Sequence, residues 1–215
     1  EVMEAAHGQG FNTTATIMYG HMEQYKHVAR HLLRIRDLQE KTGGFTEFVI
    51  LPFIHMESPI YLKGRARKGP TFREAILIHA ISRLVLHPLF KNIQASWTKL
   101  GHEGVRACLQ AGVNDLGGTL MNETITRAAG AAHGQETSPE EMEEIIRSIG
   151  RTPRQRSTTY GEITELQRQK SFGAVTLLEP TYTSAKKYER KQSRKEQELV
   201  RNELEPEKLT SQDII

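Results

Sequence analysis

Polar side chains that could bind a ligand or take part in acid–base chemistry follow several short apolar runs of this sequence. Ser96 comes directly after "NIQA", while Asn114 and Asp115 follow "AGV" and precede "LGG". Gly20 ends a further apolar run, "ATIMY", and Glu23 comes three residues later. Hydroxyl, amide and carboxylate groups at the ends of buried strands are the groups from which a parallel sheet builds a ligand site. The sequence therefore predicts a site where these runs end.

Two more candidates, Glu47 and His55, belong to the run "FTEFVILPFIH". A carboxylate inside an apolar strand requires a partner or a polar cavity, so Glu47 is either a site residue or one half of a structural ion pair. His55 follows the same strand. Gly20 and Glu23 also have an ordinary interpretation, a tight turn before a helix whose N-terminus favours a carboxylate. Spacing alone leaves these alternatives open.

Four apolar runs alternate with helical patterns and must position these residues. The expected strands are residues 15–20, 45–53, 92–97 and 113–120, and the helices that follow them are residues 23–40, 72–86, 102–112 and 122–131. Repeated strand–helix units with short connections predict an α/β fold with parallel strands and right-handed crossovers. Either a doubly wound sheet or half of a (β/α)8 barrel fits this pattern.

The C-terminal part of the sequence has a different composition. A surface helix is expected at residues 138–150, where Ser138 and Glu141 form a capping box and Gly150 ends the helix. From Thr164 onward the chain is rich in charges of both signs, which is typical of a solvated helix or a disordered segment. We therefore expect a folded domain at residues 1–163 and a charged tail at residues 164–215.

Composition excludes several classes of protein. The 29 Lys and Arg and 26 Asp and Glu among 215 residues give a net charge of +3 without a basic stripe, which argues against nucleic-acid binding. One cysteine, Cys108, rules out an internal disulfide and is typical of a reducing compartment such as the cytoplasm. The sequence contains no run of about 18 apolar residues, so no membrane span is predicted. Because the sequence begins with Glu1, we expect that an N-terminal portion is missing.

Six segments together carry a resemblance to a known family. They are "TTATIMYGHMEQ", "IRDLQEKTGGFTEFVILPFIHMESPIY", "RKGPTFREA", "NIQASWTKLG", "GVNDLGGTLMNETITRAAGAAHGQ" and "RTPRQRSTTYGE". These segments closely resemble the deazaflavin (FO) synthase family, and more narrowly its tyrosine-using 4-hydroxyphenyl transferase. The resemblance extends from about residue 10 to residue 162 and is nearly continuous. Menaquinone-pathway enzymes share versions of "TGGFT" and "ASW" and look like more distant relatives.

The resemblance implies the C-terminal half of a (β/α) radical S-adenosylmethionine barrel. It implies S-adenosylmethionine and a 4Fe-4S cluster as cofactors, L-tyrosine and 5-amino-6-(D-ribitylamino)uracil as substrates, and a ring-closing module or subunit as partner. The 4-hydroxybenzyl group of tyrosine would be transferred to the uracil. The resemblance implies two contacts to S-adenosylmethionine, Gly20 and Glu23, and five contacts to tyrosine or the ribityl uracil: Glu47, His55, Ser96, Asn114 and Asp115.

The sequence departs from the family at the cluster. The family binds its cluster through a Cys-x3-Cys-x2-Cys motif, and this chain has one cysteine, so it contributes no metal ligand and is expected to be inactive alone. A second reading is a non-catalytic half-barrel that binds a ligand or assembles with a partner through its open sheet edge. A third and weaker reading, a nucleic-acid binder using "RTPRQR" and the lysine-rich tail, requires strongly salt-dependent binding.

Overall fold

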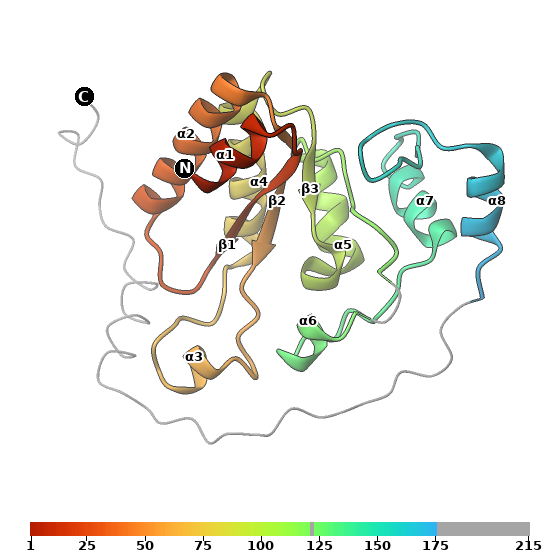
Figure 1. Cartoon of the computed structure of the whole chain (residues 1–215). Helices are drawn as coiled ribbons and strands as arrows, with labels where there is room; N and C mark the ends of the chain where they lie inside the picture. Colours follow the sequence, from red (N-terminus) through yellow and green to blue (C-terminus); the bar gives the residue numbers. More distant parts are fainter. Residues whose placement is uncertain (121–122, 176–215) are drawn as a thin grey trace.

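Three parallel strands form the centre of the molecule. A computed structural model describes residues 1–120 and 123–175. The strands are β1 (Thr13–Tyr19), β2 (Phe45–Pro52) and β3 (Ile93–Ala95), and they lie side by side in the order β1-β2-β3. Helix α2 (Tyr25–Thr42) connects β1 to β2, α4 (Phe72–Leu86) lies between β2 and β3, and α5 (Trp97–Gln110) follows β3. Figure 1 shows these helices together on one face of the sheet.

The two faces of the sheet differ in chemistry because side chains alternate along each strand. Phe48 and Ile50 of β2 are fully buried in the core beneath the helices. Glu47 and Val49 of β2 therefore point to the opposite face. We call this opposite face the open face; by register it carries Thr14, Thr16, Met18, Glu47, Val49, Leu51 and Gln94. It is markedly more polar than the core.

Capping residues explain where the two long crossover helices, α2 and α4, begin and end. Helix α4 has the expected bounds, because Thr71 and Glu74 form a reciprocal capping box at its start. Helix α2 ends at Thr42, two residues later than the expected range, and its C-cap Gly43 adopts a left-handed φ of 64°. It begins two residues later than expected, so that Glu23 lies in the turn before the helix.

The fourth strand expected at residues 113–120 is wrong. One bridge, between Gln94 and Asp115, pairs this segment with β3. Gly112 and Gly117 flank it with φ values of 108° and 75°, so the backbone turns away after a few residues. The strand expected at 92–97 is likewise shortened to β3.

The helices near the carboxyl ends of the strands also differ from expectation. The helix expected at 122–131 is reduced to the single turn α6 (Ile125–Ala128). Helix α5 begins at Trp97 rather than at residue 102 and is kinked at Gly101, whose φ is 66°. Figure 1 shows α6 and the short α3 (Pro59–Leu62) beyond the carboxyl ends of the strands.

Three further helices lie outside the strand–helix units. Helix α1 (Val2–Gly8) was not expected, α7 (Pro139–Arg147) has the expected Ser138–Glu141 capping box, and α8 is Glu165–Phe172. A hydrogen bond of 2.9 Å from Arg168 of α8 to Glu143 joins α8 to α7. The boundary at residues 163/164 stays a prediction, and most of the expected tail, residues 176–215, lies outside the described residues.

The α/β class with a parallel sheet is confirmed. Three hydrogen-bonded strands make an open sheet in the described part of the chain, and a closed barrel stays a prediction. Across residues 1–120 and 123–175, no helix combines the length and the apolar character needed to cross a membrane.

Cys108 belongs to α5, and its side chain is fully buried in the core. Burial raises the pKa of its thiol to about 12, because a thiolate would be poorly solvated there. We expect a thiol reagent such as DTNB to modify folded protein at least a hundredfold more slowly than urea-unfolded protein, as measured by absorbance. A control variant, Cys108→Ala with Ala29→Cys on the exposed side of α2, should react rapidly in both states. Equal rates for folded and unfolded Cys108 would contradict its burial.

Candidate functional site

The turn after β1 is closed by the carboxylate of Glu23. The backbone N–H groups of Gly20 and His21 donate to Glu23 over 2.5 and 3.0 Å, and that of Met22 donates over 3.2 Å. Burial by itself would raise the pKa of Glu23, but the hydrogen bonds from Gly20 and His21 and the nearby Arg67 outweigh burial and lower it. Glu23 is therefore an ionised group that holds the turn in one conformation.

Arg67 connects this turn to the start of α4. Its guanidinium lies 3.5 Å from Glu23 Oε1 and 3.0 Å from Glu74 Oε2. Its backbone N–H also donates to the carbonyl of His21 over 2.9 Å. The loop after β2 is thus fastened to the loop after β1 at the carboxyl edge of the sheet.

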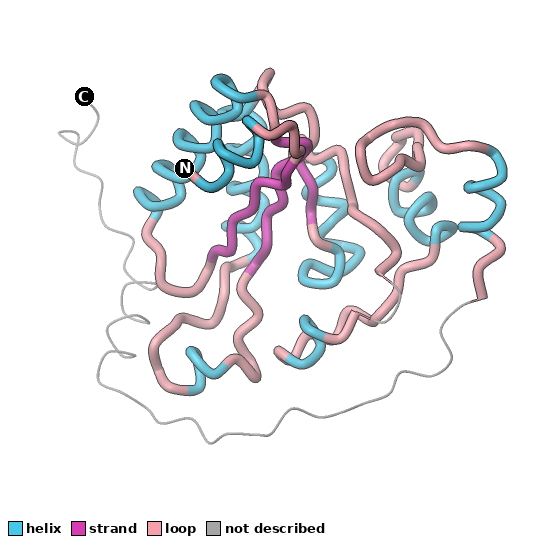
Figure 2. Tube along the Cα trace, viewed as in Figure 1, coloured by secondary structure: helices cyan, strands magenta, loops and turns pink. Residues whose placement is uncertain are grey.

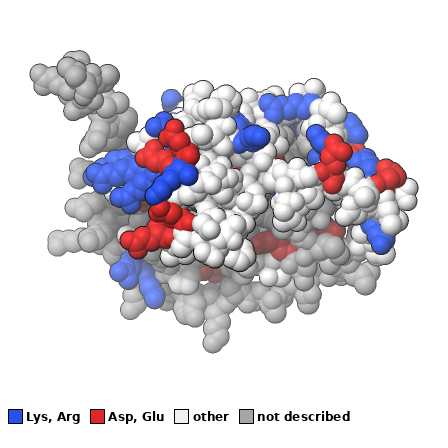
Figure 3. Space-filling model, turned by 45° about the horizontal axis from the view of Figure 1, so that its top comes forward, with Lys and Arg blue, Asp and Glu red and all other residues white. Residues whose placement is uncertain are grey.

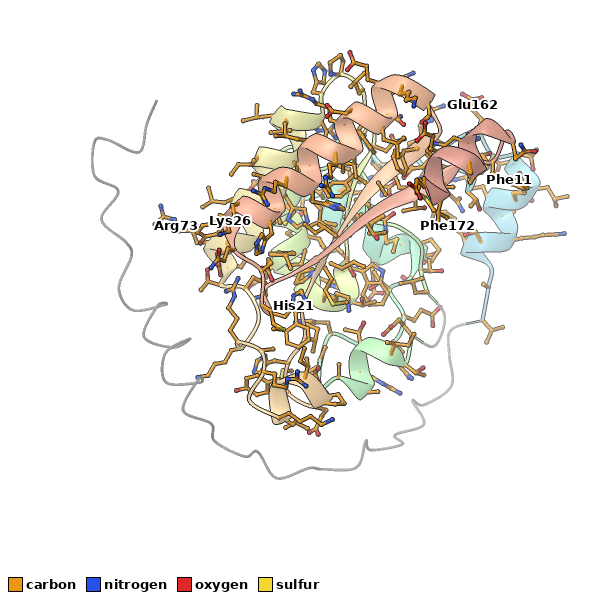
Figure 4. All side chains as sticks on the ribbon, turned by 60° about the vertical axis from the view of Figure 1, so that its left-hand side comes forward. Phe11, His21, Lys26, Arg73, Glu162 and Phe172 are labelled. Carbon is orange, nitrogen blue, oxygen red and sulfur yellow. The ribbon has the colours of Figure 1, made fainter. Side chains whose placement is uncertain are left out.

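Close backbone contact brings the two loops together. A side chain at Gly20 would overlap Pro70, whose Cδ lies 2.2 Å from the position of a Cβ atom. The His21 ring lies 5.6 Å from that of Phe53, and the His55 ring contacts that of Tyr61 edge-on at 4.7 Å. Figure 4 shows His21 where β1 ends. Gly20, Glu23 and His55 therefore lie in adjoining loops, as the sequence predicts.

Ser96 lies at the carboxyl end of β3 and precedes α5. Its hydroxyl is 3.0 Å from that of Thr98. In the next turn, Lys99 Nζ donates to Thr126 Oγ1 over 3.2 Å. Burial lowers the pKa of Lys99, and the charge of Glu123 partly opposes this shift. Lys99 is not among the site residues expected from the sequence, although its ammonium group is partly removed from water at the edge where a site is expected.

Asn114 does not lie at the carboxyl edge, so its expected position is wrong. Its backbone N–H donates to the carbonyl of Ile93, the first residue of β3, over 3.2 Å. Its side-chain oxygen accepts from Arg83 over 2.6 Å and from the Ile93 N–H over 2.9 Å. Because the segment pairs with the start of a three-residue strand, Asn114 stabilises the amino end of the sheet, away from Gly20 and Ser96.

Asp115, the next residue, belongs to a polar cluster on the open face. Its carboxylate pairs with the Arg156 guanidinium through two contacts of 2.5 and 3.0 Å and accepts from the Gly117 N–H over 2.6 Å. The Asp115 side chain is 5% exposed and that of Arg156 is 27% exposed. A bidentate pair with this degree of burial is geometrically specific.

Tyr160 and Glu47 complete the cluster. The Arg156 guanidinium lies 4.0 Å from the centre of the Tyr160 ring. Glu47 accepts a hydrogen bond from Thr14 of β1 through Oε1. Burial, then Asp115, and to a smaller extent Glu47 raise the pKa of Tyr160, so the phenol is neutral and its hydroxyl keeps its proton. We call Glu47, Asp115, Arg156 and Tyr160 the open-face cluster.

Two members of the cluster, Arg156 and Tyr160, were missed from the sequence. They lie 41 and 45 residues after Asp115, in the segment "RTPRQRSTTYGE", which contributes to the family resemblance but in which no site residue was expected. The sequence carries no pattern that marks them. In the structure, Tyr160 has a positive φ of 63°, which is unusual for an aromatic residue. Hydrogen bonds between Ser157 and Gly161 hold this loop.

The residues of this chain do not fit an iron–sulfur cluster. Such a cluster requires three thiolates, whereas the chain has only Cys108. No group of three or more His, Cys, Asp or Glu residues suited to a metal ion occurs in the part of the chain that the structure describes. The 215 residues of this chain thus include no ligand set for such a cluster.

Comparison with known proteins decides the family. Residues 42–169 match the family described as the CofH/MqnC C-terminal region, which is more than half of the chain. The chain belongs to this family. The match includes β2, β3, helices α3 to α7 and the open-face cluster, but it begins after Gly20 and Glu23.

Relatives of this CofH/MqnC-type chain fall into two groups of different length. An FO synthase of Nocardia farcinica is 50% identical over 163 residues, covering 76% of this chain and 19% of the relative. A 5-amino-6-(D-ribitylamino)uracil–L-tyrosine 4-hydroxyphenyl transferase of Methanothermobacter thermautotrophicus is 49% identical over 166 residues, covering 77% and 45%. Its namesake in Methanocaldococcus jannaschii is 49% identical over 159 residues, covering 74% and 44%. The chain thus spans about a fifth of FO synthase and under half of the separate transferase.

Proposed function

We propose that this chain forms part of a radical S-adenosylmethionine transferase that joins the 4-hydroxybenzyl group of L-tyrosine to 5-amino-6-(D-ribitylamino)uracil. The observation that carries the proposal is the identity of about half of all aligned residues to proteins named for this reaction. Its sheet would supply part of a (β/α) barrel, and a ring-closing module or subunit would be its partner. We infer a cytoplasmic location from the single cysteine.

The carboxyl edge supports this proposal through its rigidity. S-adenosylmethionine with a reduced cluster would supply the radical, and the cluster would be bound by residues outside this chain. Gly20 and Glu23 remain our candidates for the contact with S-adenosylmethionine. Because the Glu23 carboxylate is already engaged by the turn and by Arg67, its role would be to hold the backbone of residues 20–22 in place. Figure 2 shows the adjoining loops beyond the ends of the strands.

His55, Ser96 and Lys99 would face substrate at the same edge. His55 and Ser96 offer a ring nitrogen and a hydroxyl, while Lys99 offers an ammonium group whose lowered pKa favours proton transfer. Asn114 stays a weak candidate for substrate binding, because its side chain already binds Arg83 and the backbone of β3.

A non-catalytic ligand-binding or assembly protein is the alternative, and nucleic-acid binding is less well supported. In the face shown in Figure 3, acidic and basic side chains lie next to one another, without a continuous basic surface. The absence of cluster cysteines from this chain is the observation that favours the non-catalytic alternative. Only the catalytic proposal requires that this segment supports turnover when joined to a cluster-binding half.

A chimera tests this requirement. The aligned 166-residue segment of the Methanothermobacter transferase would be replaced by the matching segment of this chain, and the protein would be reconstituted anaerobically. We expect product from L-tyrosine and the ribityl uracil, detected by mass spectrometry, at no less than about a hundredth of the parent rate. The unaltered transferase is the positive control. A chimera that folds and carries its cluster, but forms no product, would support the non-catalytic alternative.

A further inference from the structure

The open-face cluster is more than a structural ion pair. We propose that Glu47, Asp115, Arg156 and Tyr160 form a subsite for a polyhydroxyl chain, namely the ribityl group of the aminouracil substrate. This inference rests on the proposed function and deepens it, since it assigns one part of one substrate to residues of this chain. Arg156 and Tyr160 are new members of the site.

Two polar atoms of the cluster, Glu47 Oε2 and the Tyr160 hydroxyl, are shielded from solvent. Glu47 Oε2 has no hydrogen-bond partner among the residues that the structure describes. The Tyr160 hydroxyl interacts with the Asp115 carboxylate, but not in the geometry of an ordinary hydrogen bond. Buried polar atoms are normally satisfied by water or a ligand, so these two atoms offer hydrogen-bonding capacity to a ligand.

The charges of the cluster favour a ligand that donates hydrogen bonds. The two carboxylates, Glu47 and Asp115, outnumber the single guanidinium of Arg156, which pairs with Asp115. Asp115 uses its oxygens on Arg156 and Gly117, which leaves Glu47 Oε2 as the strongest open acceptor. Thr14, whose proton is donated to Glu47, can still accept a hydrogen bond, and the Tyr160 hydroxyl can donate or accept one. A chain of hydroxyls, each a donor and an acceptor, matches this combination.

An amino acid matches the cluster less well. The carboxylate of L-tyrosine would require a cation, and Arg156, the guanidinium of the cluster, is already held by Asp115 in a bidentate pair and stacked on Tyr160. Separating a pair of this kind to bind a second carboxylate would be costly. The ribityl group of the aminouracil therefore fits the cluster better than L-tyrosine does.

Backbone strain at Tyr160 fits a role in binding. A positive φ is unfavourable for a bulky side chain and persists only where the surroundings enforce it. Here the loop of residues 157–161 places the phenol against Arg156 and Asp115, on the same face as Glu47. The loop thus places the phenol beside the Asp115–Arg156 ion pair.

Binding without turnover tests the subsite. Calorimetric titrations of the chimera, without reductant, would use three ligands: 5-amino-6-(D-ribitylamino)uracil, 5,6-diaminouracil, which lacks the polyol, and L-tyrosine. We expect Glu47→Gln and Tyr160→Phe each to weaken binding of the ribityl compound about tenfold, with the other two ligands unaffected. Glu40→Gln, the same change on the exposed side of α2, is the matched control and should change nothing.

Each other outcome has a defined meaning. Weaker binding of L-tyrosine alone would assign the subsite to the amino acid and overturn this inference while leaving the proposed function intact. Equal losses for the ribityl compound and 5,6-diaminouracil would show that the cluster binds the ring. Unchanged affinities would make the cluster purely structural. If the unsubstituted chimera binds neither substrate, the proposed function itself fails. Should the chimera not fold, the same titrations on the 215-residue chain decide the matter.

Discussion

Replacing Gly20 with alanine should lower the free energy of unfolding by about 3 kcal/mol, because two unfavourable terms add. The φ of 92° at this position is poorly tolerated by any residue with a side chain. The added methyl group would also lie 2.2 Å from Pro70 Cδ and 2.5 Å from Pro70 N, so that backbone must move. Urea unfolding followed by circular dichroism measures the loss.

Gly43→Ala is the matched control for Gly20→Ala. Gly43 also has a left-handed φ, 64°, but no atom lies within 4 Å of the position of a Cβ atom. Its replacement should cost about 1 kcal/mol, the backbone term alone. The difference between the two variants then measures the contact between the loops after β1 and β2. Equal losses would show that these loops separate easily.

Acidification from pH 7 to pH 5 should cost about 2 kcal/mol of stability through His79 alone. This residue of α4 is fully buried, and its Nδ1–H donates to the Ala75 carbonyl over 2.6 Å. Burial lowers the pKa of His79 from 6.5 to about 4, with the Ala75 hydrogen bond opposing the shift. Below pH 6.5 the unfolded chain therefore binds a proton that the folded chain rejects, and stability falls until about pH 4.

His79→Leu isolates this contribution. Leucine has a similar size and does not titrate, so the variant should lose about 2 kcal/mol less than the unsubstituted protein over the same pH interval. The lowered pKa of His31, another partly buried histidine, acts in the same direction and is present in both proteins. Parallel stability curves for the two proteins between pH 7 and pH 5 would contradict a neutral, buried His79.

Helix ends were predictable from the sequence because their signals are local. Thr71 with Glu74 and Ser138 with Glu141 each form a capping box within four consecutive residues, and Gly43 ends α2 through its own conformation. The segment at 113–120 was mistaken for a strand because an apolar run next to glycines does not show how far pairing extends. Positive φ at Gly117 stops the pairing after Asp115.

The candidate site was predicted only in part, since sequence spacing does not reveal distant contacts. Gly20, Glu23 and His55 follow two neighbouring strands, so the rule that parallel strands end at one edge brought them together. The same rule misplaced Asn114, because it assumes that the residue lies at the end of its strand. Arg156 reaches Asp115 across 41 residues through a loop with no periodic pattern, and only the structure shows that contact.

The position of β1 at the edge of the sheet has a consequence for hydrogen–deuterium exchange. Within the described part of the chain β1 has one neighbour, whereas β2 lies between two strands. Alternate amides of β1 therefore point away from the sheet and should exchange early, while amides of β2 are shielded along its pairing with both neighbours. A further strand added beside β1 would convert this alternation into uniform protection. The exchange pattern of seven residues, Thr13–Tyr19, thus reports whether the sheet has been extended by another half.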